Sequence, residues 1–167
     1  MLPKGCPIYT SNLKAQEALG LYIQDMLARG LIVPSKSLVV SPVLLVPKSD
    51  GTLQPCVDFK RLNAVTKPDH YPMPLMPDII KMILGAKVFS KLYLKYAFNQ
   101  VPGKKEHQRF TAFKCPKGIF EYKVMLFGLR NAPAVFQRMI DQVLGCLIGV
   151  CCVAYMDDIL VFSHLKE

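Results

Sequence analysis

An adjacent pair of carboxylates, Asp157 and Asp158, stands between two strongly apolar runs near the end of the sequence. The runs cover residues 150–155 and 159–162, so the pattern predicts a strand, an acidic turn and a second strand. Like charges at short range repel each other unless a cation or a proton neutralises them, and a divalent metal ion is the natural partner. Both aspartates can reach one site only if the chain turns sharply at the pair, because neighbouring side chains on a strand point to opposite faces. The alternative is a solvated turn, since acidic residues are common in turns.

The rest of the chain mixes helices with hairpins and shows no regular alternation of strand and helix. We expect an amphipathic helix over 13–29 with Ser11 or Asn12 as its cap and Gly30 as its end, a hairpin over 41–59, and a helix capped by Asn131 with an apolar face of Val135, Met139, Val143 and Leu144. Pro55 predicts an edge position for the second hairpin strand, because proline cannot donate to a sheet ladder. The order of elements predicts an α+β fold in one globular unit, with mainly antiparallel pairing.

Basic residues outnumber acidic ones by 21 to 12 and give a formal net charge of +9 at pH 7. This charge favours polyanionic partners such as nucleic acid, although small basic domains without that role are common. The six cysteines show no metal-binding spacing and are predicted to be reduced core residues. The N-terminus lacks the apolar region of a signal peptide, and the most apolar stretch, 143–156, is too short to span a bilayer. We therefore expect an intracellular protein, cytoplasmic or nuclear, with no membrane partner.

Six ordered motifs resemble the reverse transcriptase domain of Ty3/gypsy-type LTR retrotransposons. In chain order they lie within 41–63, 71–74, 89–92, 120–122, 127–137 and 155–158, and the last reads Tyr-Met-Asp-Asp, like the catalytic hairpin of that family. The resemblance covers nearly the whole chain and implies the right-hand polymerase fold, with an antiparallel palm sheet that has helices on one face. It places the fingers at about 1–85 and 99–125 and the palm at about 86–98 and 120–167, in a single domain fragment truncated before the thumb.

In that family two Mg²⁺ or Mn²⁺ ions join an incoming dNTP to the 3′-hydroxyl of a primer, so the resemblance implies these ions as cofactors. Three carboxylates hold the ions, and Asp157 and Asp158 match two of them as catalytic and metal-binding residues. The third position lies between Leu92 and Leu94, where this sequence has Tyr93. A phenol is bulky, stays protonated at neutral pH and is a poor Mg²⁺ ligand. We therefore expect weakened metal binding and DNA synthesis that is impaired or absent.

The resemblance also assigns contacts to the expected partners, an RNA or DNA primer-template and a dNTP. The substrate-binding positions are Lys48, Phe98, Phe127, Gly128 and Gln137. The nucleic-acid-binding positions are Lys60, Arg61, Asn131, Tyr155 and Met156. Phe98 could equally be a core aromatic, and Lys60 and Arg61 a solvated basic surface. Gln54 replaces the arginine expected on the neighbouring strand and cannot neutralise phosphate, so triphosphate binding is expected to be weaker. Leu126 departs from the proline that is usual just before the segment that begins at Phe127.

Three interpretations remain open at this point. The first is a reverse transcriptase by descent, an RNA-directed DNA polymerase whose activity is lost or impaired. The second is a non-catalytic nucleic-acid-binding module, either a relic or a domesticated domain. The third is a product without function that folds poorly because an unpaired sheet edge invites aggregation.

Overall fold

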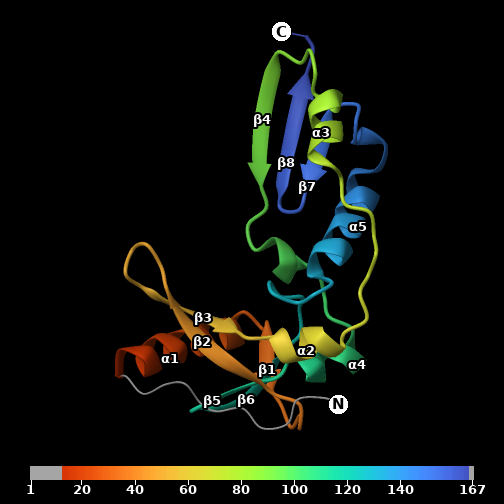
Figure 1. The fold of residues 1–167 in the computed structure, drawn as a ribbon. Coiled ribbons are helices and arrows are strands. Elements are labelled where there is room, and N and C mark those ends of the chain that lie inside the picture. The colour runs from red at the N-terminus through yellow and green to blue at the C-terminus, as the bar shows by residue number, and fades with distance from the viewer. Residues whose placement is uncertain (1–12, 166–167) are drawn as a thin grey trace. The chain divides into compact units, whose positions relative to one another are not determined.

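The computed structural model describes residues 13–165, which form two compact units (Figure 1). Unit 1 contains residues 13–67 and 99–130, and unit 2 contains 68–98 and 131–165. Each unit is thus built from two separate stretches of chain, and the chain passes three times between them.

A five-stranded sheet forms unit 1, in the order β1-β6-β5-β2-β3. Its strands are β1 (Ile32–Pro34), β2 (Ser41–Pro47), β3 (Leu53–Val57), β5 (Phe113–Cys115) and β6 (Gly118–Tyr122). Strands β2 and β5 pair in parallel, and the other neighbours pair antiparallel. The predicted hairpin is confirmed as β2 and β3, and β3 is an edge strand, as Pro55 indicated.

The core of unit 1 lies between this sheet and two of its helices. The helices of the unit are α1 (Leu13–Ala28), α2 (Lys60–Val65) and the short α4 (Lys105–Gln108). Leu19 and Ile23 of α1 pack with Phe113 and Tyr122 of the sheet in one buried cluster. Helix α1 ends as expected, with Gly30 in a left-handed conformation (φ 67°). The two candidate N-cap residues lie outside the described part of the chain.

Unit 2 contains a three-stranded antiparallel sheet in the order β4-β8-β7, together with helices α3 and α5 (Figure 1). Its elements are α3 (Met76–Met82), β4 (Val88–Tyr93), α5 (Ala132–Leu144), β7 (Cys152–Tyr155) and β8 (Asp158–Ser163). Ile79 of α3 packs against Val153 and Phe162 of the sheet. Strand β4 is an edge strand, and all its residues are exposed.

The apolar face predicted for the helix after Asn131 is wrong at Val143, whereas Val135, Met139 and Leu144 are half-buried. Val143 is 71% exposed, whereas Phe136, Gln137 and Ile140 are buried. The buried face is offset because Gln137 is held inside by hydrogen bonds, which a ranking by apolar character cannot reveal. Asn131 does stand at the start of α5, but its Oδ1 accepts a hydrogen bond from the backbone N–H of Asp69 (3.1 Å) and not from the helix.

The cysteines of the described residues are all free thiols. Cys115 and Cys152 are buried, as expected for core residues, and burial raises the pKa of both thiols. Cys146 is exposed, so the prediction that every cysteine belongs to the core is wrong there.

Candidate active site

The acidic hairpin of unit 2 has a two-residue turn. Tyr155 pairs with Asp158, which leaves Met156 and Asp157 as the turn residues. Met156 has a φ of 54°, the left-handed conformation that tight hairpin turns require. The two carboxylates are therefore not equivalent, because Asp157 lies in the turn and Asp158 is the first residue of β8.

Strand β4 ends beside this turn. Tyr93 is in register with Asp158, and the backbone N–H of Leu94 donates to the carbonyl oxygen of Asp157 (3.1 Å). Side chains of directly paired residues lie on the same face of a sheet, so Tyr93, Asp158 and Tyr155 form a row across the three strands. The phenol thus occupies the place next to the acidic pair where the family resemblance expects a carboxylate, and it is 70% exposed.

Lys91 supplies a positive charge to the same face. Its Nζ lies 3.0 Å from Oδ2 of Asp158, and the two side chains are 63% and 47% exposed. An ion pair this exposed contributes little stability. The other oxygen of Asp158, Oδ1, is covered from solvent and has no hydrogen-bond partner within the described residues.

The donors at this site do not fit the two-ion set of a polymerase. The resemblance implies three carboxylates for the two ions, and here the set is Asp157, Asp158 and the phenol of Tyr93, which is a poor ligand for Mg²⁺. Between residues 13 and 165 no group of three His, Cys, Asp or Glu side chains is arranged to hold a metal ion. No catalytic step through metal ions follows from these residues as they stand.

Gln137 reaches this hairpin from α5 and is fully buried. Its Oε1 accepts the backbone N–H of Met156 (3.1 Å), and its Nε2 donates to the carbonyl oxygen of Ala154 (3.3 Å) and to Oδ1 of Asp141 (2.9 Å). The amide of Gln137 therefore faces the hairpin. If Gln137 affects substrate binding, it does so by positioning the hairpin.

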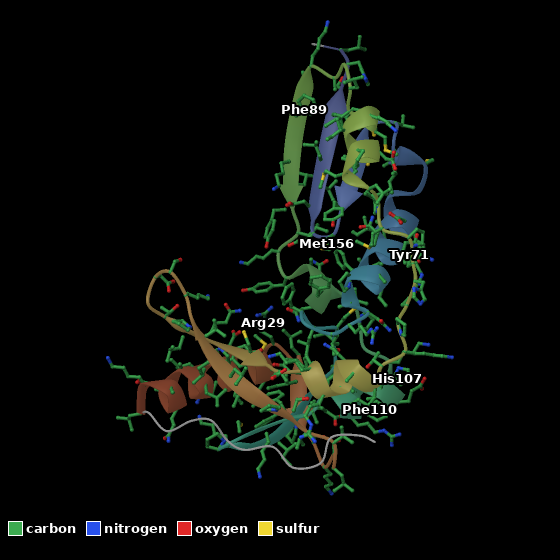
Figure 2. The ribbon with its side chains drawn as sticks, in the orientation of Figure 1. Arg29, Tyr71, Phe89, His107, Phe110 and Met156 are labelled. Atoms are coloured by element: carbon green, nitrogen blue, oxygen red, sulfur yellow. The ribbon has the colours of Figure 1, made fainter. Side chains whose placement is uncertain are left out.

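Other predicted positions of unit 2 lie at the hairpin or pack against α5. The ring of Phe98 is half-buried and packs against Phe136 with ring centroids 5.1 Å apart. Tyr155 is 37% exposed at the end of β7. Figure 2 shows Met156 at the turn of the hairpin and Tyr71 beside α5.

In unit 1, Asn63 joins the basic start of α2 to the predicted substrate segment. Its Nδ2 donates to the carbonyl oxygen of Gly128 (2.7 Å), and its Oδ1 accepts the backbone N–H of Arg130 (2.8 Å). Gly128 has a φ of 90°, a conformation that favours glycine, and Phe127 beside it is 83% exposed. Helix α2 begins with Lys60, which is exposed and is followed directly by a second exposed cation.

Lys48 stands at the other end of β3, at the tip of the β2–β3 hairpin. Its backbone N–H donates to the carbonyl oxygen of Thr52 (2.8 Å), and its side chain is exposed. A strand of this length spans about 17 Å. The structure therefore brings Phe127 and Gly128 to α2 but leaves Lys48 apart from Lys60.

Three residues of these sites had no role in the sequence predictions. Asn63 is the last residue of the first motif, 41–63. The sequence signal for its role is a polar side chain that follows one helical turn. Asp141 follows Gln137 by four residues, the spacing at which helix side chains meet. Lys91 is diagonal to Asp158 across β4 and β8, so only the strand register could reveal it.

The fold and the acidic hairpin are those of the reverse transcriptase class of proteins, and comparison with known proteins agrees. Residues 46–167 match the family described as "Reverse transcriptase (RNA-dependent DNA polymerase)". The chain belongs to this family. It is 42% identical over 151 residues to the Transposon Tf2-3 polyprotein of Schizosaccharomyces pombe (strain 972 / ATCC 24843), a match that covers 90% of this chain and 11% of the polyprotein. The resemblance to Ty3/gypsy-type retrotransposons is thereby confirmed, and the chain spans about a tenth of the relative's length.

Solved structures share the fold over nearly the whole chain. The foamy viral protease-reverse transcriptase in complex with RNA/DNA hybrid aligns with a TM-score of 0.87 at 24% identity, covering 99% of this chain and 22% of that one. The prototype foamy virus protease-reverse transcriptase (CSH mutant) aligns with a TM-score of 0.84 at 27% identity, again over 99% and 22%. The predicted α+β fold of fingers and palm is confirmed. Within residues 13–165, no helix is both long enough and apolar enough to cross a membrane.

Proposed function

We propose that this chain is the fingers-and-palm part of a retrotransposon reverse transcriptase that binds primer-template but has an impaired polymerase site. In this proposal unit 1 is the fingers and unit 2 the palm. The expected partners are an RNA–DNA duplex, as in the foamy viral complex, and a dNTP.

One observation carries the impairment. Tyr93 is in register with Asp158, and the next backbone N–H is bonded to Asp157, so the phenol stands where the third carboxylate is needed. A neutral side chain there cannot hold an ion between the hairpin and β4, and the positioning and charge stabilisation that metal ions supply to nucleotidyl transfer are weakened.

Primer extension on an RNA template tests this part of the proposal. With either Mg²⁺ or Mn²⁺, the unmodified chain is expected to add no nucleotides above the background without protein. Robust DNA synthesis by the unmodified chain would overturn the impairment.

The retained basic residues support binding to nucleic acid. Lys48, Lys60 and Arg61 are exposed cations of unit 1, and the chain has a net charge of +9. If these three side chains contact phosphates, the logarithm of the association constant should fall with a slope of about −2 to −3 against the logarithm of salt concentration. Fluorescence anisotropy with a labelled RNA–DNA duplex over a KCl series measures this slope, and affinity no better than that of a neutral protein at low salt would rule out the binding role.

A further inference from the structure

We propose that Asp141 and Tyr71 are positioning residues: they orient the amide of Gln137, and through it they fix the backbone of the acidic hairpin at Met156. All of these residues belong to unit 2. The inference concerns the position of the hairpin and does not depend on whether the chain polymerises nucleotides.

The polarity of the hydrogen bonds at Gln137 carries the argument. The backbone N–H of Met156 can only donate, so Oε1 must face it, and Nε2 must then face acceptors. Nε2 has two, the carbonyl oxygen of Ala154 and Oδ1 of Asp141. An ionised carboxylate only accepts, so Asp141 permits this orientation and opposes the reversed one, in which two oxygens would face each other and two N–H groups would clash at Met156.

Tyr71 holds the carboxylate in place from the other side. Its hydroxyl donates to Oδ2 of Asp141 (2.7 Å), and this hydrogen bond raises the pKa of Tyr71. The guanidinium of Arg138 lies 4.7 Å from the centre of the Tyr71 ring and is paired with both oxygens of Asp69 (2.8 and 2.9 Å). Asp69 in turn accepts the backbone N–H of Tyr71 (3.1 Å), so the tyrosine is fixed at its ring and at its backbone.

This arrangement matters because Gln137 accepts its hydrogen bond from Met156, which lies in the turn of the acidic hairpin. Met156 has a φ of 54°, and the residue after it is Asp157. The Ala154 carbonyl belongs to β7, an edge strand of the sheet, and the Met156 N–H belongs to the turn that follows this strand. A buried side chain from α5 thus completes the edge of the sheet and holds a left-handed residue at the turn, which sets the direction in which Asp157 leaves the strand.

A double-mutant cycle with exchanged hydrogen-bond polarity tests the proposal. In Gln137→Glu the new carboxylate faces the Asp141 carboxylate and the Ala154 carbonyl, and amide hydrogen exchange at Met156 should become about 30-fold faster. In Asp141→Asn the new amide can still accept from Gln137 and can donate to the Tyr71 oxygen, so exchange should stay within about threefold of the unmodified chain. In the double variant the new asparagine donates to the new glutamate, and exchange at Met156 should be about tenfold slower than in Gln137→Glu alone.

Two references separate positioning from general loosening. Gln142→Glu makes the same chemical change on an exposed position of α5 and should leave Met156 unchanged. The amide of Phe162, bonded to the Cys151 carbonyl in the same sheet (2.8 Å), should keep its exchange rate in the variants. Absence of recovery in the double variant, or an equal acceleration at Phe162, would overturn the proposal.

Tyr71→Phe provides an independent arm in case the charged variants do not fold. It removes one hydroxyl and leaves the ring packing, so exchange at Met156 should become about fivefold to tenfold faster. An unchanged rate would remove Tyr71 from the network.

Discussion

Replacing Tyr93 by aspartate should make the stability of the protein depend on a divalent cation. The new carboxylate would stand directly opposite Asp158 and beside the turn residue Asp157. Side chains in such pairs have Cβ atoms about 5 Å apart, and two charges about 6 Å apart repel by roughly 0.7 kcal/mol in bulk water and roughly 3 kcal/mol at a protein surface. Because Asp158 is 47% exposed and already faces Lys91, we expect a value near the lower end, about 1–2 kcal/mol.

A cation that binds only the folded protein should reverse this loss. The stabilisation is RT ln(1 + [M]/Kd), or about 2.7 kcal/mol when the metal concentration is 100 times Kd. Urea denaturation of the Tyr93→Asp chain in EDTA and in rising Mn²⁺, at constant ionic strength, should therefore show first a deficit and then a gain in the free energy of unfolding. The unmodified chain should change little over the same series.

Tyr93→Asn is the matched control, because asparagine has the size of aspartate without its charge. If the asparagine variant gained as much stability from Mn²⁺ as the aspartate variant, the ion would be binding elsewhere. If the aspartate variant gained nothing in millimolar Mn²⁺, the missing carboxylate would not be what limits metal binding at the hairpin.

Three further predictions concern unit 1. Replacing Lys60 and Arg61 together by alanine should reduce the salt slope of RNA–DNA binding by about 2 for every duplex sequence, and an unchanged slope in the anisotropy assay would remove α2 from the binding surface. Tyr22 and Tyr122 share a hydrogen bond between their hydroxyls (2.7 Å), and burial raises the pKa of both phenols, so their contribution to stability is complete below about pH 10 and is lost as the pH rises towards their folded-state pKa values. Urea denaturation above about pH 10 should show a loss of up to about 1.4 kcal/mol per pH unit for each phenol, and replacing both by phenylalanine should flatten this dependence. Asn63→Ala should cost about 1–3 kcal/mol of unfolding free energy by urea denaturation, since it removes two hydrogen bonds to the segment after β6, and Asn63→Asp should cost less because it keeps the accepted bond.

Local chemistry made several elements of the fold predictable. Pro55 placed β3 at a sheet edge and Gly30 ended α1, because each residue restricts its own backbone whatever surrounds it. The buried face of α5 was not predictable in the same way. Gln137 is buried because it forms a hydrogen bond with Ala154 of β7. Val143 is apolar, but it lies on the side of α5 that faces solvent.

In the candidate site, too, residue type alone reveals some features, and long-range packing decides the others. The acidic pair and the substitution at position 93 are visible in the sequence, since they depend only on residue type at matched positions. That Tyr93 is paired with Asp158, and that Lys91 reaches the same carboxylate, depends on strand register, which long-range pairing decides. The hydrogen bonds of Asp141 depend on how α5 packs and could not be inferred from spacing alone.

The interleaving of the two units has a consequence for how the chain is made. Ile32 finds its partner at Tyr122, and Val88 finds its partner at Ser163, so a chain emerging from the ribosome completes the first sheet only after Tyr122 has been made and the second only after Ser163. Such long-range pairing slows folding and leaves strand edges open in the meantime. Strand β4 is exposed on both faces even in the finished unit, and before β8 appears it has no strand to pair with in the described sheet. The nascent chain should therefore carry an unprotected apolar strand from the synthesis of β4 until β8 has been made, and in this interval chaperones act and aggregation begins.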